Sequence, residues 1–307
     1  MLDNSVVGII TPKKYILNGL WFGPGITLRD SSRRGGAEKP KRVIIWVHGL
    51  GSSAFSMLHV VQRLGDAETA VLTFNNRGFG TINRIKKIGK KSKSLVAGSV
   101  HEVFTDSVDD IQGAINFVKK QGVKEIYLAG HSTGCQKSVY WAHKNKGGRD
   151  VKGIILVAPV SDHADALQPD KRRQVARLAK IAQLLIKKGK PHELLPQSPQ
   201  NHPGALFFFD AQRFLSLYTP DSKETIFSYE QLKKDPRTLK SVRVPILMLW
   251  AEKDEFSDRP ATRVVEWFRN NTLTKLETSV VPGVLHSFHG AEKEVAECIK
   301  EWILGKK

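Results

Sequence analysis

The sequence predicts an α/β fold, a three-layer sandwich in which helices cover both faces of a mostly parallel central sheet. Short runs of aliphatic and β-branched residues that are apolar on both faces indicate strands buried within a parallel sheet. The segments between them place apolar residues at three- and four-residue steps, as amphipathic helices do. Strands that alternate with helices pair in parallel through right-handed crossovers, which put helices on both sides of the sheet.

Each expected strand ends in a glycine or a cluster of turn-forming residues. The strands are residues 42–47, 70–74, 125–129, 153–157, 246–250 and 276–281. Helical spacing is clearest over residues 108–118 and 295–302, and a further helix is expected over residues 135–144, directly after the third strand. These elements form the predicted core.

The alternation of strands and helices stops between the fourth and fifth strands. Residues 173–188 have helical spacing, and a second helix is expected to begin at residues 207–209 and to end near Leu217. A long stretch without strands inside a compact fold usually carries function. Alternatively, this stretch has no functional role and only covers the edge of the sheet. We predict a core of residues 1–160 and 241–307 with an inserted, mainly helical lid of residues 161–240.

A candidate nucleophile follows the third expected strand. Residues 130–134 read Gly-His-Ser-Thr-Gly, with a strand before them and a helix after them, which is the context of a G-x-S-x-G nucleophile elbow. The sharp turn strains the backbone of Ser132, and the small residues two positions away on either side avoid clashes. The helix N-terminus then favours negative charge that develops near the serine oxygen.

A serine nucleophile needs a base, and the base needs an acid that orients it. Asp254 follows the fifth expected strand, and His286 lies between the sixth strand and the last helix. The chain order Ser, Asp, His suits a nucleophile on this kind of turn. The competing residues are Glu255 and Asp258 for the acid and His289 for the base.

Other conspicuous residues have structural interpretations. His48 is expected to bond the backbone of its own loop, and Arg77 to tie loops together after the second strand. Cys135 is expected to pack as a small hydrophobic residue rather than to act as a second nucleophile. Together with Cys298 it gives no disulfide framework and no metal-ligand spacing.

Several motifs together resemble the α/β-hydrolase superfamily over nearly the whole chain outside the lid. They are His-Gly-Leu-Gly at 48–51, Asn-Arg-Gly-Phe-Gly at 76–80, the elbow, the Asp254 loop and His-Ser-Phe at 286–288. Within the superfamily the sequence is similar to capped serine esterases and lipase-like enzymes, including the feruloyl-esterase type. The extended elbow Gly-His-Ser-Thr-Gly-Cys-Gln also resembles that of siderophore esterases, which tend to carry an acid where this chain has Lys137.

The resemblance implies hydrolysis of carboxylic esters through an acyl-enzyme, with no metal and no organic cofactor. It assigns the oxyanion hole to the backbone N–H groups of Thr133, next to the nucleophile, and of Leu50, in the loop after the first core strand. The lid would give an apolar wall for the acyl or alcohol part of the substrate. The residues expected in that wall are Phe207, Phe208, Phe214 and Leu217.

The predicted function is therefore that of a carboxylesterase, with lactones and aromatic-acid esters among the candidate substrates. Thioesterases, monoacylglycerol lipases, amidases and acyltransferases of the same fold share the chemistry and stay open. An alternative of another class is a non-catalytic basic protein that binds nucleic acid or an anionic membrane. That alternative predicts a damaged triad, whereas all three members are present.

A net charge as large as +18 usually indicates polyanionic partners. Six of the ten residues 84–93 are basic, and we expect a solvated basic loop there, with no specific nucleic-acid partner and at most peripheral contact with anionic surfaces. The substrate is expected to be a small-molecule ester. No run of 18 apolar residues and no signal-like start is found, so a cytoplasmic setting is expected.

Overall fold

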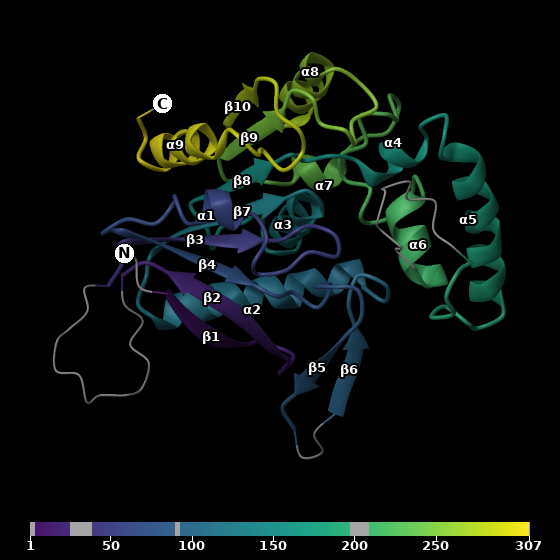
Figure 1. Cartoon of the computed structure of the whole chain (residues 1–307), viewed down its shortest axis with the longest axis horizontal. Coiled ribbons are helices and arrows are strands. Elements are labelled where there is room, and N and C mark those ends of the chain that lie inside the picture. The colour runs from purple at the N-terminus through teal and green to yellow at the C-terminus, as the bar shows by residue number, and fades with distance from the viewer. Residues whose placement is uncertain (1–3, 25–38, 90–92, 197–208, 307) are drawn as a thin grey trace.

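The computed structural model describes residues 4–24, 39–89, 93–196 and 209–306 (Figure 1). Its main sheet has the strand order β1-β2-β4-β3-β7-β8-β9-β10. β2 pairs with β1 and β4 in antiparallel fashion, and from β4 to β10 all neighbours are parallel. The strands are β1 (Asn4–Ile10), β2 (Ile16–Phe22), β3 (Arg42–Val47), β4 (Thr69–Phe74), β7 (Glu125–His131), β8 (Gly153–Val157), β9 (Ile246–Ala251) and β10 (Leu276–Val281).

The six strands expected from the sequence are all present, as β3, β4, β7, β8, β9 and β10. The sequence analysis did not find β1 and β2, which form an antiparallel edge of the sheet. β1 is only half-buried, with exposed Val6 and Ile10 beside buried Val7 and Ile9, so it lacks the continuous buried run of a central strand.

Helices cover both faces of the sheet, which confirms the predicted layers (Figure 1). Side chains of α2 (Ser107–Lys120), α3 (Thr133–Lys144) and α8 (Ala261–Asn271) share one apolar cluster, and those of α1 (Leu58–Val61) and α9 (Glu292–Ile303) share the other. β3 divides between the two, because alternate side chains of a strand point to opposite faces. Val43, Ile45 and Val47 join the first cluster, and Ile44 and Trp46 join the second.

The segment between β8 and β9 is helical in its described residues. It contains α4 (Asp162–Ala166), α5 (Arg172–Lys187), α6 (Ala211–Tyr218) and α7 (Arg237–Lys240). α5 matches the helix expected over residues 173–188, and α6 begins later than expected, at Ala211 behind an Asp210 cap. α4, α5 and α6 share a separate apolar cluster, whereas Ile226 to Leu239 packs into the main core. The role of this insertion as a lid stays a prediction.

The basic segment 84–93 is not the loop that we expected. Most of its described residues belong to a two-stranded antiparallel sheet of β5 (Asn83–Lys87) and β6 (Lys93–Ala97), which projects from the body in Figure 1. Ile85 and Ala97 are buried against the core, whereas Arg84 and Lys86 on the alternate positions are exposed. The apolar–polar alternation was the missed signal, because basic residues obscured it.

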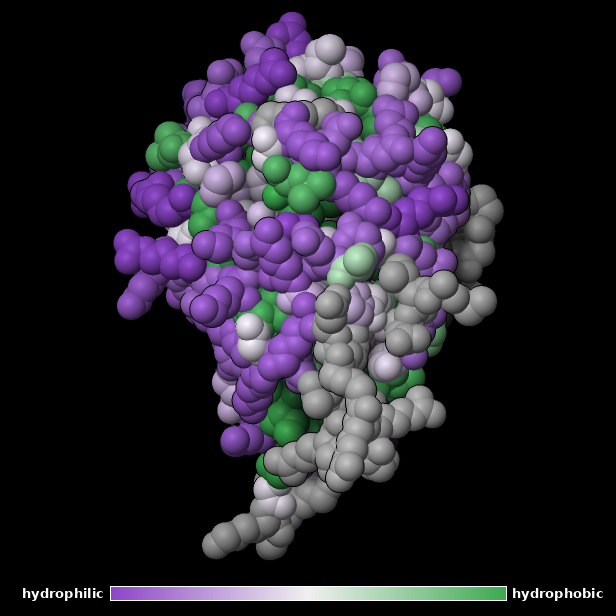
Figure 2. Space-filling model, turned by 90° about the vertical axis from the view of Figure 1, so that its left-hand side faces the viewer, coloured by the Kyte–Doolittle hydropathy of each residue, from purple (hydrophilic) through white to green (hydrophobic). Residues whose placement is uncertain are grey.

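Hydrophilic residues cover most of the face shown in Figure 2, with hydrophobic residues only in scattered patches. Among the described helices, none has both the length and the apolar character that crossing a bilayer requires.

Candidate active site

The loops at the carboxyl ends of four parallel strands bring the expected site residues to one edge of the sheet. Gly49 and Leu50 follow β3, Ser132 follows β7, Asp254 follows β9 and His286 follows β10. Ligand sites in open α/β sheets form at this edge because the loops there converge.

Ser132 occupies the strained turn that the motif predicts. Its backbone has φ 56° and ψ −129°, a combination that residues other than glycine rarely adopt. A Cβ at Gly130 would overlap the carbonyl of Gly134, and a Cβ at Gly134 would overlap the carbonyl of Val47. The two glycines therefore let α3 begin directly against the ends of β3 and β7.

Asp254 and His286 form a buried hydrogen-bonded pair. His286 Nδ1 lies 2.8 Å from Asp254 Oδ2, and the other carboxylate oxygen accepts the backbone N–H of Phe256 at 3.1 Å. Because a carboxylate can only accept, the Nδ1 atom carries the proton. The Nε2 atom is then left as an acceptor, which is the tautomer that a general base for a serine hydroxyl needs.

Two residues that the sequence analysis did not assign hold His286 in place. The ring of His131 lies 4.8 Å from that of His286, centroid to centroid, and its Nε2 donates to the His286 carbonyl at 3.1 Å. Burial and the neighbouring His286 lower the pKa of His131 to about 3, so that its ring is neutral at neutral pH. Phe256 packs edge-on against His286 at a centroid distance of 4.8 Å. The position of His131 beside the nucleophile was the available signal.

The competing acids and base lie elsewhere. Glu255 accepts the backbone N–H of His286 at 2.9 Å, so it positions the loop and does not contact the ring through its carboxylate. Asp258 pairs with Arg259 at 2.8 Å. His289 is exposed and stacks on His59. Asp254 is the candidate acid that the structure places on the His286 ring.

The two expected oxyanion donors, Leu50 and Thr133, belong to segments next to Ser132. Thr133 is the first residue of α3, where a helix has no internal partner for its N–H groups. Leu50 follows Gly49, whose Cα is so close to Ser132 that an added Cβ would lie 3.4 Å from Ser132 Oγ. Within the described ranges, neither the Thr133 nor the Leu50 N–H donates a hydrogen bond. Their assignment to an oxyanion hole stays a prediction.

Substitution of Gly49 by Ala is expected to lower kcat of any reaction that uses Ser132 by about 10–100-fold, since a displacement of about 1 Å at a reacting group costs this much. The new methyl group would lie 2.9 Å from Ser132 Cβ and would push the nucleophile aside. Steady-state kinetics tests this. The matched control is Gly8→Ala on exposed β1, where a Cβ meets nothing within 4 Å and kcat should not change. Equal activity of both variants would contradict the close approach of Gly49.

A buried network of charges connects the elbow helix with the insertion. Lys137 of α3 and Arg213 of α6 are both fully buried, and Glu102 joins them through ion pairs of 2.6 and 2.8 Å. Arg213 also pairs with Glu224, which accepts from Ser216 at 2.8 Å. In the sequence Lys137 is distinctive only because siderophore esterases tend to carry an acid at this position, and its ion-pair partners were not predicted.

Substitution of Glu102 by Ala is expected to lower the free energy of unfolding by about 3–5 kcal/mol, because it leaves two buried cations without their shared anion. Thermal unfolding should show a lower Tm by roughly 6 °C or more. The control is Asp150→Asn, which removes an exposed ion pair with Lys119 and should cost about 1 kcal/mol or less. Similar losses of unfolding free energy from both substitutions would show that the buried ion pairs stabilise the fold no more than an exposed ion pair does.

The same variant has a predictable pH dependence. Burial alone would raise the pKa of Glu102, but Lys137 and Arg213 outweigh it and lower that pKa from 4.5 to about 2. A depressed carboxyl pKa contributes stability that is present above the unfolded value and is lost as the pH falls. The difference between wild type and Glu102→Ala should therefore shrink from pH 4.5 towards pH 2.

The three structural interpretations agree with the contacts observed. His48 Nδ1 bonds the Gly49 carbonyl at 2.8 Å, and burial together with Lys137 lowers the pKa of His48 to about 3. Arg77 binds Asp110 at 2.7 Å and Asp109 at 3.1 Å, and so ties its turn to α2. Cys135 is buried, and burial raises its pKa well above the usual value, so it is unsuited to act as a thiolate.

The expected substrate wall is described only in part. Phe207 and Phe208 lie outside the described residues. Phe214 and Leu217 are fully buried in the cluster that α4, α5 and α6 share, and Leu50 packs against this cluster from the core side. Contact of these residues with substrate stays a prediction.

Comparison with solved structures finds the same fold along almost the whole chain. A carboxyl esterase from Bacillus coagulans matches with a TM-score of 0.66 at 16% identity, over 99% of both chains. Est1E from Butyrivibrio proteoclasticus matches with a TM-score of 0.58 at 17% identity, over 98% of both chains. An esterase from Pyrococcus furiosus matches with a TM-score of 0.59 at 17% identity, over 99% of this chain and 91% of the other. A search among curated proteins found no match.

These identities establish a common fold and leave substrate specificity to the individual sites. The model of one family, described as serine aminopeptidase S33 (Hydrolase_4), matches residues 38–294. The match spans the elbow and the loops of Asp254 and His286, and it includes the insertion. Together with the strand order and the strained serine, it identifies the chain as a member of this family of α/β-hydrolases.

Proposed function

We propose that the protein hydrolyses carboxylic esters through an acyl-enzyme formed on Ser132. The observation that carries the proposal is the buried Asp254–His286 pair, with His131, the residue before the serine, packed against the His286 ring. A hydrogen-bonded acid and imidazole beside an elbow serine form the unit that activates a serine hydroxyl.

In the proposed reaction Ser132 Oγ attacks the ester carbonyl carbon while His286 Nε2 accepts the hydroxyl proton. Asp254 keeps the imidazole oriented and stabilises its positive form. The N–H groups of Thr133 and Leu50 hold the oxyanion, each such donor contributing about 3–4 kcal/mol. His286 then gives its proton to the departing alkoxide. Water repeats the two steps on the acyl-enzyme and releases the carboxylic acid and the free serine.

The family description raises a second candidate function, cleavage of an amino-terminal residue from a peptide. An aminopeptidase must bind a free ammonium group, for which a buried carboxylate is the natural partner. Of the buried carboxylates, those of Glu102 and Glu224 are neutralised by Lys137 and Arg213, and that of Asp165 by Lys171, whereas burial raises the pKa of Asp162 to about 8, so that this carboxyl group is largely uncharged at neutral pH. The esterases that share the fold over nearly the whole chain also favour the ester function.

A substrate panel with covalent labelling tests the proposal. The panel contains p-nitrophenyl esters of increasing chain length, lactones, feruloyl esters and aminoacyl p-nitroanilides. We expect turnover of at least one ester class, and a fluorophosphonate adduct that mass spectrometry locates on Ser132. Turnover of the anilides alone would favour the aminopeptidase. Salt-dependent binding to DNA or anionic liposomes, with no turnover and no adduct, would favour the non-catalytic alternative.

A further inference from the structure

Two histidines and an aspartate meet where the insertion joins the core. His101 lies between β6 and the short helix η1 (Phe104–Asp106), His192 follows α5, and Asp210 caps α6. The Nδ1 atoms of both histidines approach the same oxygen, Asp210 Oδ2, at 2.9 and 2.8 Å. Three atoms that commonly bind metal ions therefore converge on one position, although they are more than 100 residues apart along the chain at the extremes.

Asp210 is held so that this oxygen stays directed at the histidines. Its side chain is fully buried, and its other oxygen, Oδ1, accepts the backbone N–H of Arg213 at 2.7 Å and so caps α6. Its backbone N–H donates to Val100 O at 3.1 Å, next to His101. A ligating carboxylate that is fixed by further hydrogen bonds is typical of a preorganised metal site.

We propose that His101, His192 and Asp210 bind one Zn²⁺ ion. Two imidazole nitrogens and one carboxylate oxygen are a ligand set that zinc accepts, whereas Mg²⁺ and Ca²⁺ prefer oxygen ligands throughout. Zinc would bind the Nδ1 atoms in place of the protons that they share with Asp210, and each neutral ring would then carry its one proton on Nε2. The site belongs to the insertion and the core together, so a bound ion links them.

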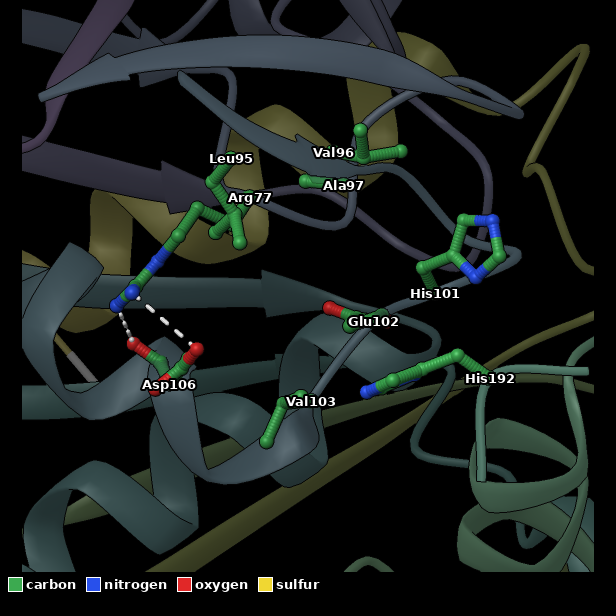
Figure 3. Close-up of a pocket in the computed structure, with 9 residues that line it drawn as sticks. All are labelled: Arg77, Leu95, Val96, Ala97, His101, Glu102, Val103, Asp106 and His192. Carbon is green, nitrogen blue, oxygen red and sulfur yellow. Dashed lines mark hydrogen bonds and ion pairs between the residues drawn. The ribbon is translucent and has the colours of Figure 1, made fainter. Parts of the chain in front are cut away.

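The geometry around the two rings agrees with this ligand set. The rings of His101 and His192 are inclined by 76° and do not stack, and the Nδ1 atom of each lies within 2.9 Å of Asp210 Oδ2. Both side chains line a cavity of about 360 Å³, which leaves room for a water molecule or a small anion as the fourth ligand (Figure 3).

A second group of three candidate ligands in the described part of the chain is less suitable. It consists of His59, His289 and Glu292. The two rings are stacked at 4.4 Å with an angle of 26°, and His289 Nδ1 lies 3.8 Å from Glu292 Oε1, against 2.8 and 2.9 Å in the first group. His59 Nε2 is also engaged with Ser287 O at 3.0 Å. This group therefore serves as the control.

The experiment measures metal binding directly, and it does not depend on ester hydrolysis. Full-length protein without an affinity tag is treated with a chelator, dialysed, and titrated with ZnCl₂ or MgCl₂ by calorimetry. We expect one Zn²⁺ per chain, an increase in Tm with Zn²⁺ concentration, and neither effect with Mg²⁺. Co²⁺ in place of Zn²⁺ should give the visible absorption of a four-coordinate ion.

Two variants and one control locate the ion. His192→Ala changes a mostly exposed side chain, and Asp210→Asn keeps the helix cap because Asn caps as well as Asp. Each should weaken Zn²⁺ binding by about 100-fold or more, since even the loss of a supporting contact costs 10–100-fold. His289→Ala should bind like the wild type. Absence of stoichiometric binding, unchanged binding in both variants, or a loss caused by His289→Ala would each overturn the proposal.

Discussion

Substitution of Ser132 by Ala is expected to lower kcat for the best ester of the panel by about 10⁴-fold or more and to abolish the fluorophosphonate adduct. The reason is that the hydroxyl is the only group that forms the covalent intermediate in the proposed mechanism. The remaining activity would come from water attack on a substrate that is still bound and polarised. Stopped-flow or steady-state kinetics on protein shown to be folded by circular dichroism measures the loss.

The control for this variant is Ser138→Ala on the same helix. Ser138 is also buried, and its hydroxyl donates to the Gly134 carbonyl at 2.8 Å, so its removal costs one helix contact and no catalytic group. Its kcat should stay within about threefold of the wild type, because the substitution removes no group of the proposed mechanism. The lost neutral hydrogen bond should cost only about 1 kcal/mol of folding stability. A rate of ester hydrolysis in Ser132→Ala equal to that of the wild type would rule out the acyl-enzyme.

Substitution of Asp254 by Asn is expected to lower kcat by about 10⁴-fold with little change in KM. Asn still accepts the Phe256 N–H through its carbonyl oxygen, and its amide group then faces His286 Nδ1. The amide donates, so the ring must adopt the tautomer with its proton on Nε2. That tautomer cannot accept the Ser132 proton. The fold should be unaffected, which thermal unfolding checks.

The alternative acids supply the controls for Asp254. Glu255→Gln keeps an oxygen for the His286 backbone N–H, and Asp258→Asn affects only a pair with Arg259. Both variants should retain kcat within about threefold of the wild type. If kcat fell 10⁴-fold in one of these two variants while Asp254→Asn stayed active, that residue and not Asp254 would be the acid that orients His286.

Sequence patterns were sufficient for the features that depend on local order. Continuous apolar runs located the six central strands, and the glycine spacing located the strained turn at Ser132. Chain order then selected Asp254 and His286, whose contact at 2.8 Å depends on β9 and β10 being neighbours. The strands and the turn were predictable because strand periodicity and turn chemistry are set by neighbouring residues, whereas the catalytic roles of Ser132, Asp254 and His286 stay predictions.

Features that depend on distant residues were not predicted. Glu102, Lys137 and Arg213 lie 35 and 76 residues apart along the chain, and nothing local in the sequence shows that they share a buried site. His101 and Asp210 meet in the same way. The projecting hairpin of β5 and β6 was missed for another reason. Its many basic side chains obscured the apolar–polar alternation along each strand, in which Ile85 and Ala97 are the buried residues.

The charge network has a consequence for exchanging parts between related enzymes. Arg213 sits in the insertion, yet it neutralises Glu102, which also serves Lys137 on the elbow helix. An insertion transplanted from a relative would replace both Arg213 and Glu224, so Glu102 would keep its ion pair with Lys137 of α3, but its buried Oε2 atom would lose the Arg213 guanidinium. Recombination at the ends of β8 and β9 should therefore give folded chimeras only when residues 102 and 137 are exchanged together with the cap. In this chain the insertion and the elbow helix share one buried ion-pair network and are expected to be exchangeable only together.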